Sequence, residues 1–180
     1  MQFINKISFL TIALAVIVAT SLNLDVQAQG LNSEPELPAG CEAIQVPAGN
    51  RISYHTYAIG VQTYRWTGTN WAFVAPTANL YASSKFRGLV GTHYAGPTWE
   101  SNSGSSVIGF RLEGCTPDKS AIQWLLLGVV SSGGPGIFAN TTYIQRVNTV
   151  GGLAPAEPGQ VIGQQADVPY TTEYYFYKAK

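Results

Sequence analysis

The sequence predicts an all-β protein, a single-domain β-sandwich or barrel of about 8–10 short antiparallel strands. The chain has 180 residues, of which 46% are hydrophobic and 11% charged, enough apolar side chains for one core. It contains 19 Gly, 10 Pro and 10 Tyr beside a single Met, a composition typical of strands and turns. Short β-prone runs, each ended by Gly, Pro, Asn or Ser, recur from Ile52 onward.

Residues 1–28 are predicted to be a signal peptide for export. Lys6 gives the positive start, residues 7–22 form an uncharged and mostly apolar run, and Val26-Gln27-Ala28 resembles a cleavage site. An uncleaved membrane anchor is the alternative, but the run has about 16 residues where a span needs about 20. We therefore expect a secreted or periplasmic protein that starts at Gln29 and has no stable membrane insertion after cleavage.

Residues 29–46 are predicted to be a polar leader segment that is anchored by Cys41. Cys41 and Cys115 are the only cysteines, and both lie in the exported part. In an oxidising compartment, two such thiols most simply form one disulfide. A metal thiolate pair and a nucleophilic cysteine are the alternatives, and no CxxC spacing supports them.

The β domain is expected over residues 47–180. Its β-prone runs are ISYHTYA (52–58), GVQTYRW (60–66), NWAFVA (70–75), ANLYA (78–82), SVIGFRL (106–112), AIQWLLLGVV (121–130), TTYIQRV (141–147) and EYYFYK (173–178). Residues 67–70, TGTN, are typical of a hairpin turn. Periodicity alone does not distinguish strand from helix over 121–130, and Gly128-Val129-Val130 at its end favours a strand.

Several strings are more specific than this pattern. They are PAGN (47–50), GVQTY (60–64), WAFVAP (71–76), GTHYAGPTWE (91–100), IQWLLL (122–127), IQRVNTVGG (144–152) and YYFY (174–177). In this order the chain resembles the DUF3455 family, exported proteins of bacteria and fungi whose function is not established. The resemblance runs from about Pro47 to Tyr177. It implies a fold unit and a compartment, but no activity.

The charge balance narrows the choice of partners. Ten Lys and Arg oppose ten Asp and Glu, so the chain lacks the basic excess that a nucleic-acid binder needs. There is no GxSxG, HExxH, Walker A or GxGxxG motif, and we expect neither a cofactor nor a metal. A neutral, aromatic-rich domain suits a glycan or a small amphipathic ligand.

The string 91–100 is the densest candidate site. Its glycines and proline predict a loop or bulge that lets His93 and Tyr94 project, with Trp99 and Glu100 following. His93 with Glu100 could act as a general acid and base. Alternatively His93, Tyr94 and Trp99 contact a ligand, or His93 bonds backbone in a tight turn while Trp99 packs in the core.

Arg146 is a second candidate, since a buried arginine can clamp a carboxylate or phosphate. Alternation places Ile144, Arg146 and Asn148 on one strand face. Pairing of Arg146 with an internal acid such as Glu100 or Glu173, or hydrogen bonding to loop carbonyls, is the other interpretation. Gln62 and Tyr64 of the GVQTY string complete the predicted ligand-binding residues.

Three functions remain open. The first is an exported, non-enzymatic binding or cell-envelope-associated β module. The second is a hydrolase or metal-dependent enzyme that uses His93 with Glu100 or Asp118, and His55 could join a metal triad. The third is a self-assembling surface or matrix protein, with residues 173–178 as an exposed edge strand. The same segment is expected to offer a tyrosine-lined surface on one face.

Overall fold

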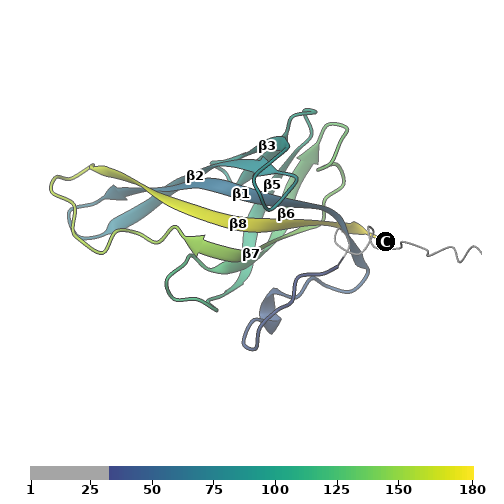
Figure 1. Cartoon of the computed structure of the whole chain (residues 1–180), viewed down its shortest axis with the longest axis horizontal. Helices are drawn as coiled ribbons and strands as arrows, with labels where there is room; N and C mark the ends of the chain where they lie inside the picture. Colours follow the sequence, from purple (N-terminus) through teal and green to yellow (C-terminus); the bar gives the residue numbers. More distant parts are fainter. Residues whose placement is uncertain (1–32) are drawn as a thin grey trace, which may run out of the picture.

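The computed structural model describes residues 33–180, so the predicted signal peptide and the start of the leader lie outside the described residues. The described chain folds into eight strands after one short 3-10 helix, η1 (Glu42–Ile44). The strands are β1 (Asn50–Trp66), β2 (Trp71–Tyr81), β3 (Leu89–Tyr94), β4 (Thr98–Ser101), β5 (Ser106–Cys115), β6 (Trp124–Gly133), β7 (Tyr143–Gly151) and β8 (Gln165–Ala179) (Figure 1).

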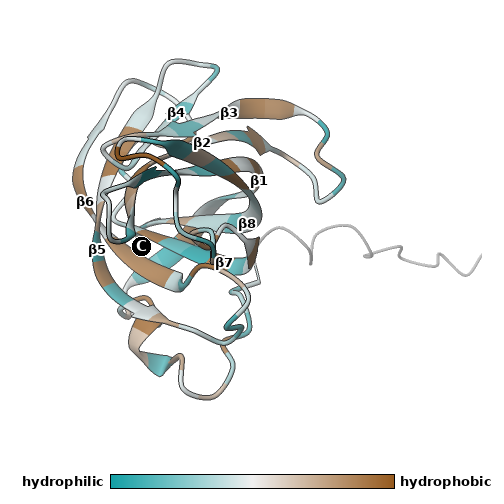
Figure 2. Cartoon of the chain, turned by 90° about the vertical axis from the view of Figure 1, so that its left-hand side faces the viewer, coloured by the Kyte–Doolittle hydropathy of each residue, from teal (hydrophilic) through white to brown (hydrophobic). Residues whose placement is uncertain are grey.

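The eight strands form one closed barrel in sequence order. Each strand pairs antiparallel with the next, and β8 returns to pair with β1. Figure 2, which looks along the barrel, shows the strands as a ring. The all-β prediction is confirmed, and of its two architectures the structure is the barrel. The predicted turn at 67–70 is also confirmed, with the Thr67 N–H donating to the Asn70 carbonyl at 2.9 Å.

Several strands are longer than predicted. Gly60 pairs with Ala78 inside one continuous ladder, so the two runs 52–58 and 60–66 are a single strand of 17 residues, β1. The ambiguous run is a strand from Trp124 onward. The string 91–100 is a hairpin of β3 and β4 rather than a loop, because Tyr94 pairs with Thr98 across a turn at 95–97.

The inside of the barrel holds the larger hydrophobic cluster, which includes Trp99, Leu127, Ile144, Tyr174 and Phe176. One end is closed by the β6–β7 loop, whose fully buried Phe138 packs on Phe176 with ring centroids 4.5 Å apart. We call this the closed end. The β1–β2 hairpin and the β3–β4 turn lie at the opposite end, here called the open end, because the strands alternate in direction.

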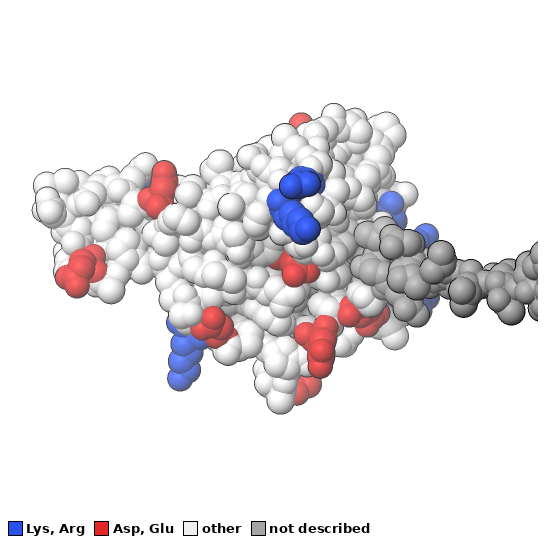
Figure 3. All heavy atoms as spheres, in the orientation of Figure 1, with Lys and Arg blue, Asp and Glu red and all other residues white. Residues whose placement is uncertain are grey.

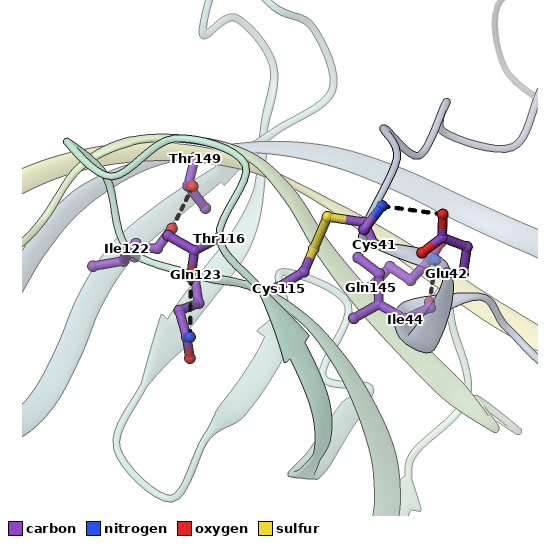
Figure 4. The surroundings of a disulfide bond; sticks show 10 residues. Cys41, Glu42, Ile44, Cys115, Thr116, Ile122, Gln123, Gln145 and Thr149 are labelled. Carbon is purple, nitrogen blue, oxygen red and sulfur yellow. Dashed lines mark hydrogen bonds between the residues drawn. A yellow bond between two sulfur atoms is a disulfide. The ribbon is translucent and has the colours of Figure 1, made fainter.

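The segment 33–49 packs outside the barrel on a second cluster. Ile44, Val46, Val147, Tyr175 and Tyr177 are buried together there. The predicted disulfide is confirmed, and it ties Cys41 to Cys115 at the end of β5 with a sequence separation of 74 (Figure 4). The expected tyrosine-lined surface is therefore wrong, because this segment covers it.

The expected edge strand is wrong as well. Within the described chain, β8 pairs with β1 on one side and with β7 on the other, so residues 173–178 present no free edge. A closed sheet has no unpaired strand from which to extend. The described residues also contain no helix with the length and hydropathy that a membrane crossing requires.

Candidate ligand cavity in the barrel lumen

A cavity of about 270 Å³ lies inside the barrel toward its open end. Every strand contributes to its wall, through Gln62, Pro76, His93, Trp99, Arg111, Leu127, Arg146 and Tyr174 in strand order. A second cavity of about 390 Å³ shares Gln62, Arg111 and Arg146 with it and adds Tyr64 and Leu153. The two cavities share these three residues, so the lumen holds a lined recess toward its open end, beside the packed hydrophobic cluster.

Glycines make room for the large side chains of this recess. A Cβ on Gly109 would lie 3.2 Å from the Trp99 ring. Gly152 has a φ of +80°, and a Cβ there would lie 2.9 Å from Tyr170. The Gly152 carbonyl accepts a hydrogen bond from the Tyr64 hydroxyl at 2.6 Å, which fixes Tyr64 in the wall of the second cavity.

His93 is buried in the wall and is held by its own hairpin. Its Nδ1 donates to the Thr98 carbonyl at 2.8 Å, and its ring stacks on Trp99 with centroids 4.3 Å apart. Burial lowers the pKa of His93 to about 3. The hydrogen bond to Thr98 opposes this shift, and the nearby Arg146 charge adds to it. The imidazole is thus neutral and weakly basic, far from the pKa that suits a general base at neutral pH.

The structure does not bring His93 together with its expected acidic partners. Alternation turns Tyr94 and Glu100 to the outside of the hairpin, where the Tyr94 hydroxyl donates to Glu100 at 2.7 Å. Asp118 is exposed in the β5–β6 loop and accepts from Ser120.

The other histidine, His55, lies outside the lumen. Its Nε2 lies 2.8 Å from Glu173 Oε2, and its ring stacks on Tyr175. Burial raises the pKa of Glu173, but hydrogen bonds from His55 and Asn148 outweigh it, and the pKa is lowered. In the described part of the chain no three His, Cys, Asp or Glu residues gather as metal ligands.

Three buried hydrogen-bonding atoms of the cavity wall have no partner in the described structure. They are Gln62 Nε2, Trp99 Nε1 and the Tyr174 hydroxyl, in side chains that are 3%, 1% and 1% exposed. Two further buried atoms, the Tyr170 hydroxyl beside Tyr174 and Thr56 Oγ1, are also unpaired in the described structure, but their residues line neither cavity. Buried polar atoms are almost always paired, and each unpaired one costs about 1–3 kcal/mol.

Arg146 brings a positive charge to the same wall. Its Nε and Nη2 both donate to the Gln123 carbonyl, at 3.1 and 2.8 Å. Among the described residues it makes no ion pair, so of the two internal contacts predicted for it, an acid or a loop carbonyl, the carbonyl contact is the one observed. The prediction that Asn148 shares a strand face with Ile144 and Arg146 is wrong. A bulge follows Val147, and Asn148 turns to the surface with a φ of +52°.

Most of the predicted ligand-binding residues meet here. Gln62, His93, Trp99 and Arg146 line the first cavity and Tyr64 the second, while Tyr94 points away. Sequence reasoning missed Tyr174 and Arg111. Tyr174 could have been found, because alternation along β8 separates it from the covered Tyr175 and Tyr177. Arg111 lies between two irregularities in the β5–β6 pairing and gave no such signal.

The comparison with family models adds an identity for the barrel. The model described as a protein of unknown function (DUF3455) matches residues 47–178. The chain belongs to the DUF3455 family. The DUF3455 match spans all eight strands, so the lumen and its polar wall are part of the family domain, while Cys41 and η1 precede it. Comparisons with curated proteins and with solved structures give no match.

Proposed function

We propose that this DUF3455 protein is an exported, non-enzymatic binding module that holds a small amphipathic ligand in the barrel lumen. One observation carries the proposal: three side chains that line one cavity carry buried polar atoms without partners in the described structure. A ligand that brings hydrogen-bond acceptors to these atoms would recover the free energy lost by their burial.

The rest of the cavity wall suits an apolar ligand body. Phe73, Pro76, Leu125 and Leu127 lie beside the rings of Trp99 and Tyr174. Small-molecule sites are typically apolar recesses with a few placed polar groups, and they often lie in the mouths of β-barrels. The outer surface offers less: on the face in Figure 3, charged side chains are sparse and scattered.

Export is supported by the disulfide, which is typical of oxidising compartments. An enzymatic role has less support. His93 lacks a carboxylate partner, and its pKa of about 3 makes it a poor proton acceptor. These two facts favour binding over acid–base catalysis in the same recess.

The test is calorimetric titration of the oxidised protein with small amphipathic compounds, such as octanoate, octanamide and octylamine. We expect at least one to bind, and Gln62→Met to weaken it about tenfold because a single hydrogen bond is lost. Gln165→Met is the matched control, since Gln165 is exposed and its side chain makes no hydrogen bond to any residue in 33–180. If no compound binds, or if both variants bind like the parent protein, the lumen is not the site.

A further inference from the structure

We infer that the polar group of this ligand is an anion, specifically a carboxylate, and that Arg146 binds it in the lumen. The inference rests on the proposed function and names the chemical class of its ligand. It follows from three features of the cavity wall: the kind of hydrogen-bonding atoms it offers, the state of its arginines, and the place of the acidic residues.

The unpartnered atoms of the wall are donors. Trp99 Nε1 and Gln62 Nε2 can only donate, and the Tyr174 hydroxyl can donate or accept. A ligand group that satisfies all three must therefore present acceptors. A carboxylate is acceptor-only, with two oxygens and about four lone-pair directions. An ammonium group has no acceptor to offer these donors, and a hydroxyl can accept from them but brings no negative charge to Arg146.

Arg146 is oriented toward the lumen and still has donors to give. The Gln123 carbonyl binds its Nε and Nη2 together, which fixes the guanidinium plane and leaves Nη1 without a hydrogen bond in the described structure. Arg146 is half-buried and lines both cavities. A planar guanidinium with a free end is suited to a carboxylate, and the charge strengthens each hydrogen bond.

No acidic side chain of the described chain neutralises this charge. Neither cavity is lined by Asp or Glu, whereas Arg111 adds a second arginine to both. Glu173, a candidate partner from the sequence, is bound to His55 and Asn148. Glu100, the other candidate, accepts from Tyr94 outside the barrel.

The positive charge also reaches the neighbouring groups of the wall. Burial raises the pKa of Tyr174 and lowers that of His93, and the Arg146 charge lowers both. His93 is neutral at physiological pH, so it neither repels a carboxylate nor balances the arginines. A partly buried charge without a counter-ion is costly, and an anionic ligand would remove that cost.

The decisive experiment compares octanoate with octanamide, which has the same length and shape but no charge. Calorimetric titration at neutral pH and low salt should show octanoate binding at least about tenfold more tightly, since charged hydrogen bonds are stronger than neutral ones. Arg146→Gln should remove most of this preference, since Arg111 is then the one arginine that the described structure leaves in the wall. Arg87→Gln should keep it, because Arg87 is an exposed residue of the β2–β3 loop with the same charge.

A second measurement does not depend on how well Arg146→Gln folds. In the parent protein, added salt should weaken octanoate more than octanamide. Equal affinities for octanoate and octanamide, or tighter binding of octylamine, would show that the ligand is not an anion. The proposed binding function would not be contradicted by that result. Retention of the preference in folded Arg146→Gln would overturn the role of Arg146. Absence of binding by every compound would instead overturn the proposed function itself.

Discussion

Each side of the barrel wall has a buried glutamine and a buried tyrosine, here called the outer pair and the lumen pair, and the two pairs differ in their hydrogen bonds. On the outer side, Gln145 donates to the Ile44 carbonyl at 2.7 Å and accepts from the Tyr177 hydroxyl. On the lumen side, Gln62 Nε2 and the Tyr174 hydroxyl have no partner in the described structure. All four side chains are 3% exposed or less.

The difference distinguishes buried polar groups that hold the fold together from buried polar groups that are available to a ligand. The outer pair joins the segment 33–49 to the barrel, and its hydrogen bonds repay the burial of its polar atoms. Gln62 Nε2 and the Tyr174 hydroxyl make no hydrogen bond within the described chain, although they are equally buried, and Tyr174 contributes to the core through its ring. The exposed fractions of the two pairs are alike. The hydrogen bonds alone distinguish a structural contact from a candidate binding site.

Removal of the disulfide should cause the largest loss of stability, and it should loosen only the segment 33–49 on the outer side of the barrel. The bond closes a loop with a sequence separation of 74, so Cys41→Ala with Cys115→Ala should cost about 4 kcal/mol of unfolding free energy. Urea unfolding measures this loss. A double variant with unchanged stability would mean that the hydrogen bonds of Gln145 hold the segment without help.

The buried imidazole of the lumen side should make stability depend on pH. Burial lowers the pKa of His93 from 6.5 to about 3, so its contribution is complete above pH 6.5 and falls as the pH decreases toward 3. The slope is about 1.4 kcal/mol per pH unit, or roughly 2 kcal/mol between pH 6.5 and 5. Urea unfolding at several pH values should show this slope, and His93→Gln should remove it.

The two glutamines provide a direct test of the comparison. Gln145→Met leaves the Ile44 carbonyl and the Tyr177 hydroxyl buried without partners, at a cost of about 2 kcal/mol. Gln62→Met removes an atom that had no partner, so it should change the free energy of unfolding by less than about 0.5 kcal/mol. Equal losses in the two variants would show that Gln62 has a structural role in the unliganded protein.

The two tyrosines should give the smallest contrast. Tyr177→Phe removes the hydroxyl that Gln145 accepts from and should cost about 1 kcal/mol. Tyr174→Phe deletes an unpaired hydroxyl and should be neutral or slightly stabilising. Thermal unfolding at one pH compares them, and a larger loss for Tyr174→Phe would reverse the assignment of the two sides.

The composition, the turns and the cysteine pair predicted the class of fold and the disulfide, because these are local or compositional properties. Closure of the sheet into a barrel could not be read locally, since it depends on pairing between the two ends of the domain. The covered tyrosines show the same limit: alternation placed Tyr175 and Tyr177 outside, but nothing local indicated that residues 33–49 lie over them.

The residues of the candidate cavity were predictable in part, because strand alternation is also a local property. Gln62, His93, Trp99 and Arg146 lie on strands where alternation has physical meaning, and they share the inner face. His93 and Glu100 were expected to act together because they are close in sequence. A hairpin with an odd separation between them turns their side chains to opposite faces, and so the pair does not form.

The ladder between β1 and β8 sets the order in which this protein can fold. It runs from Asn50 paired with Ala179 to Arg65 paired with Gln165, and thus joins the first strand of the barrel to the last one synthesised. Contacts so distant in sequence form slowly, and no earlier strand can substitute for β8. The barrel therefore stays open until β8 has been synthesised and can pair with β1. Loss of β8 should prevent closure of the whole ring rather than shorten it.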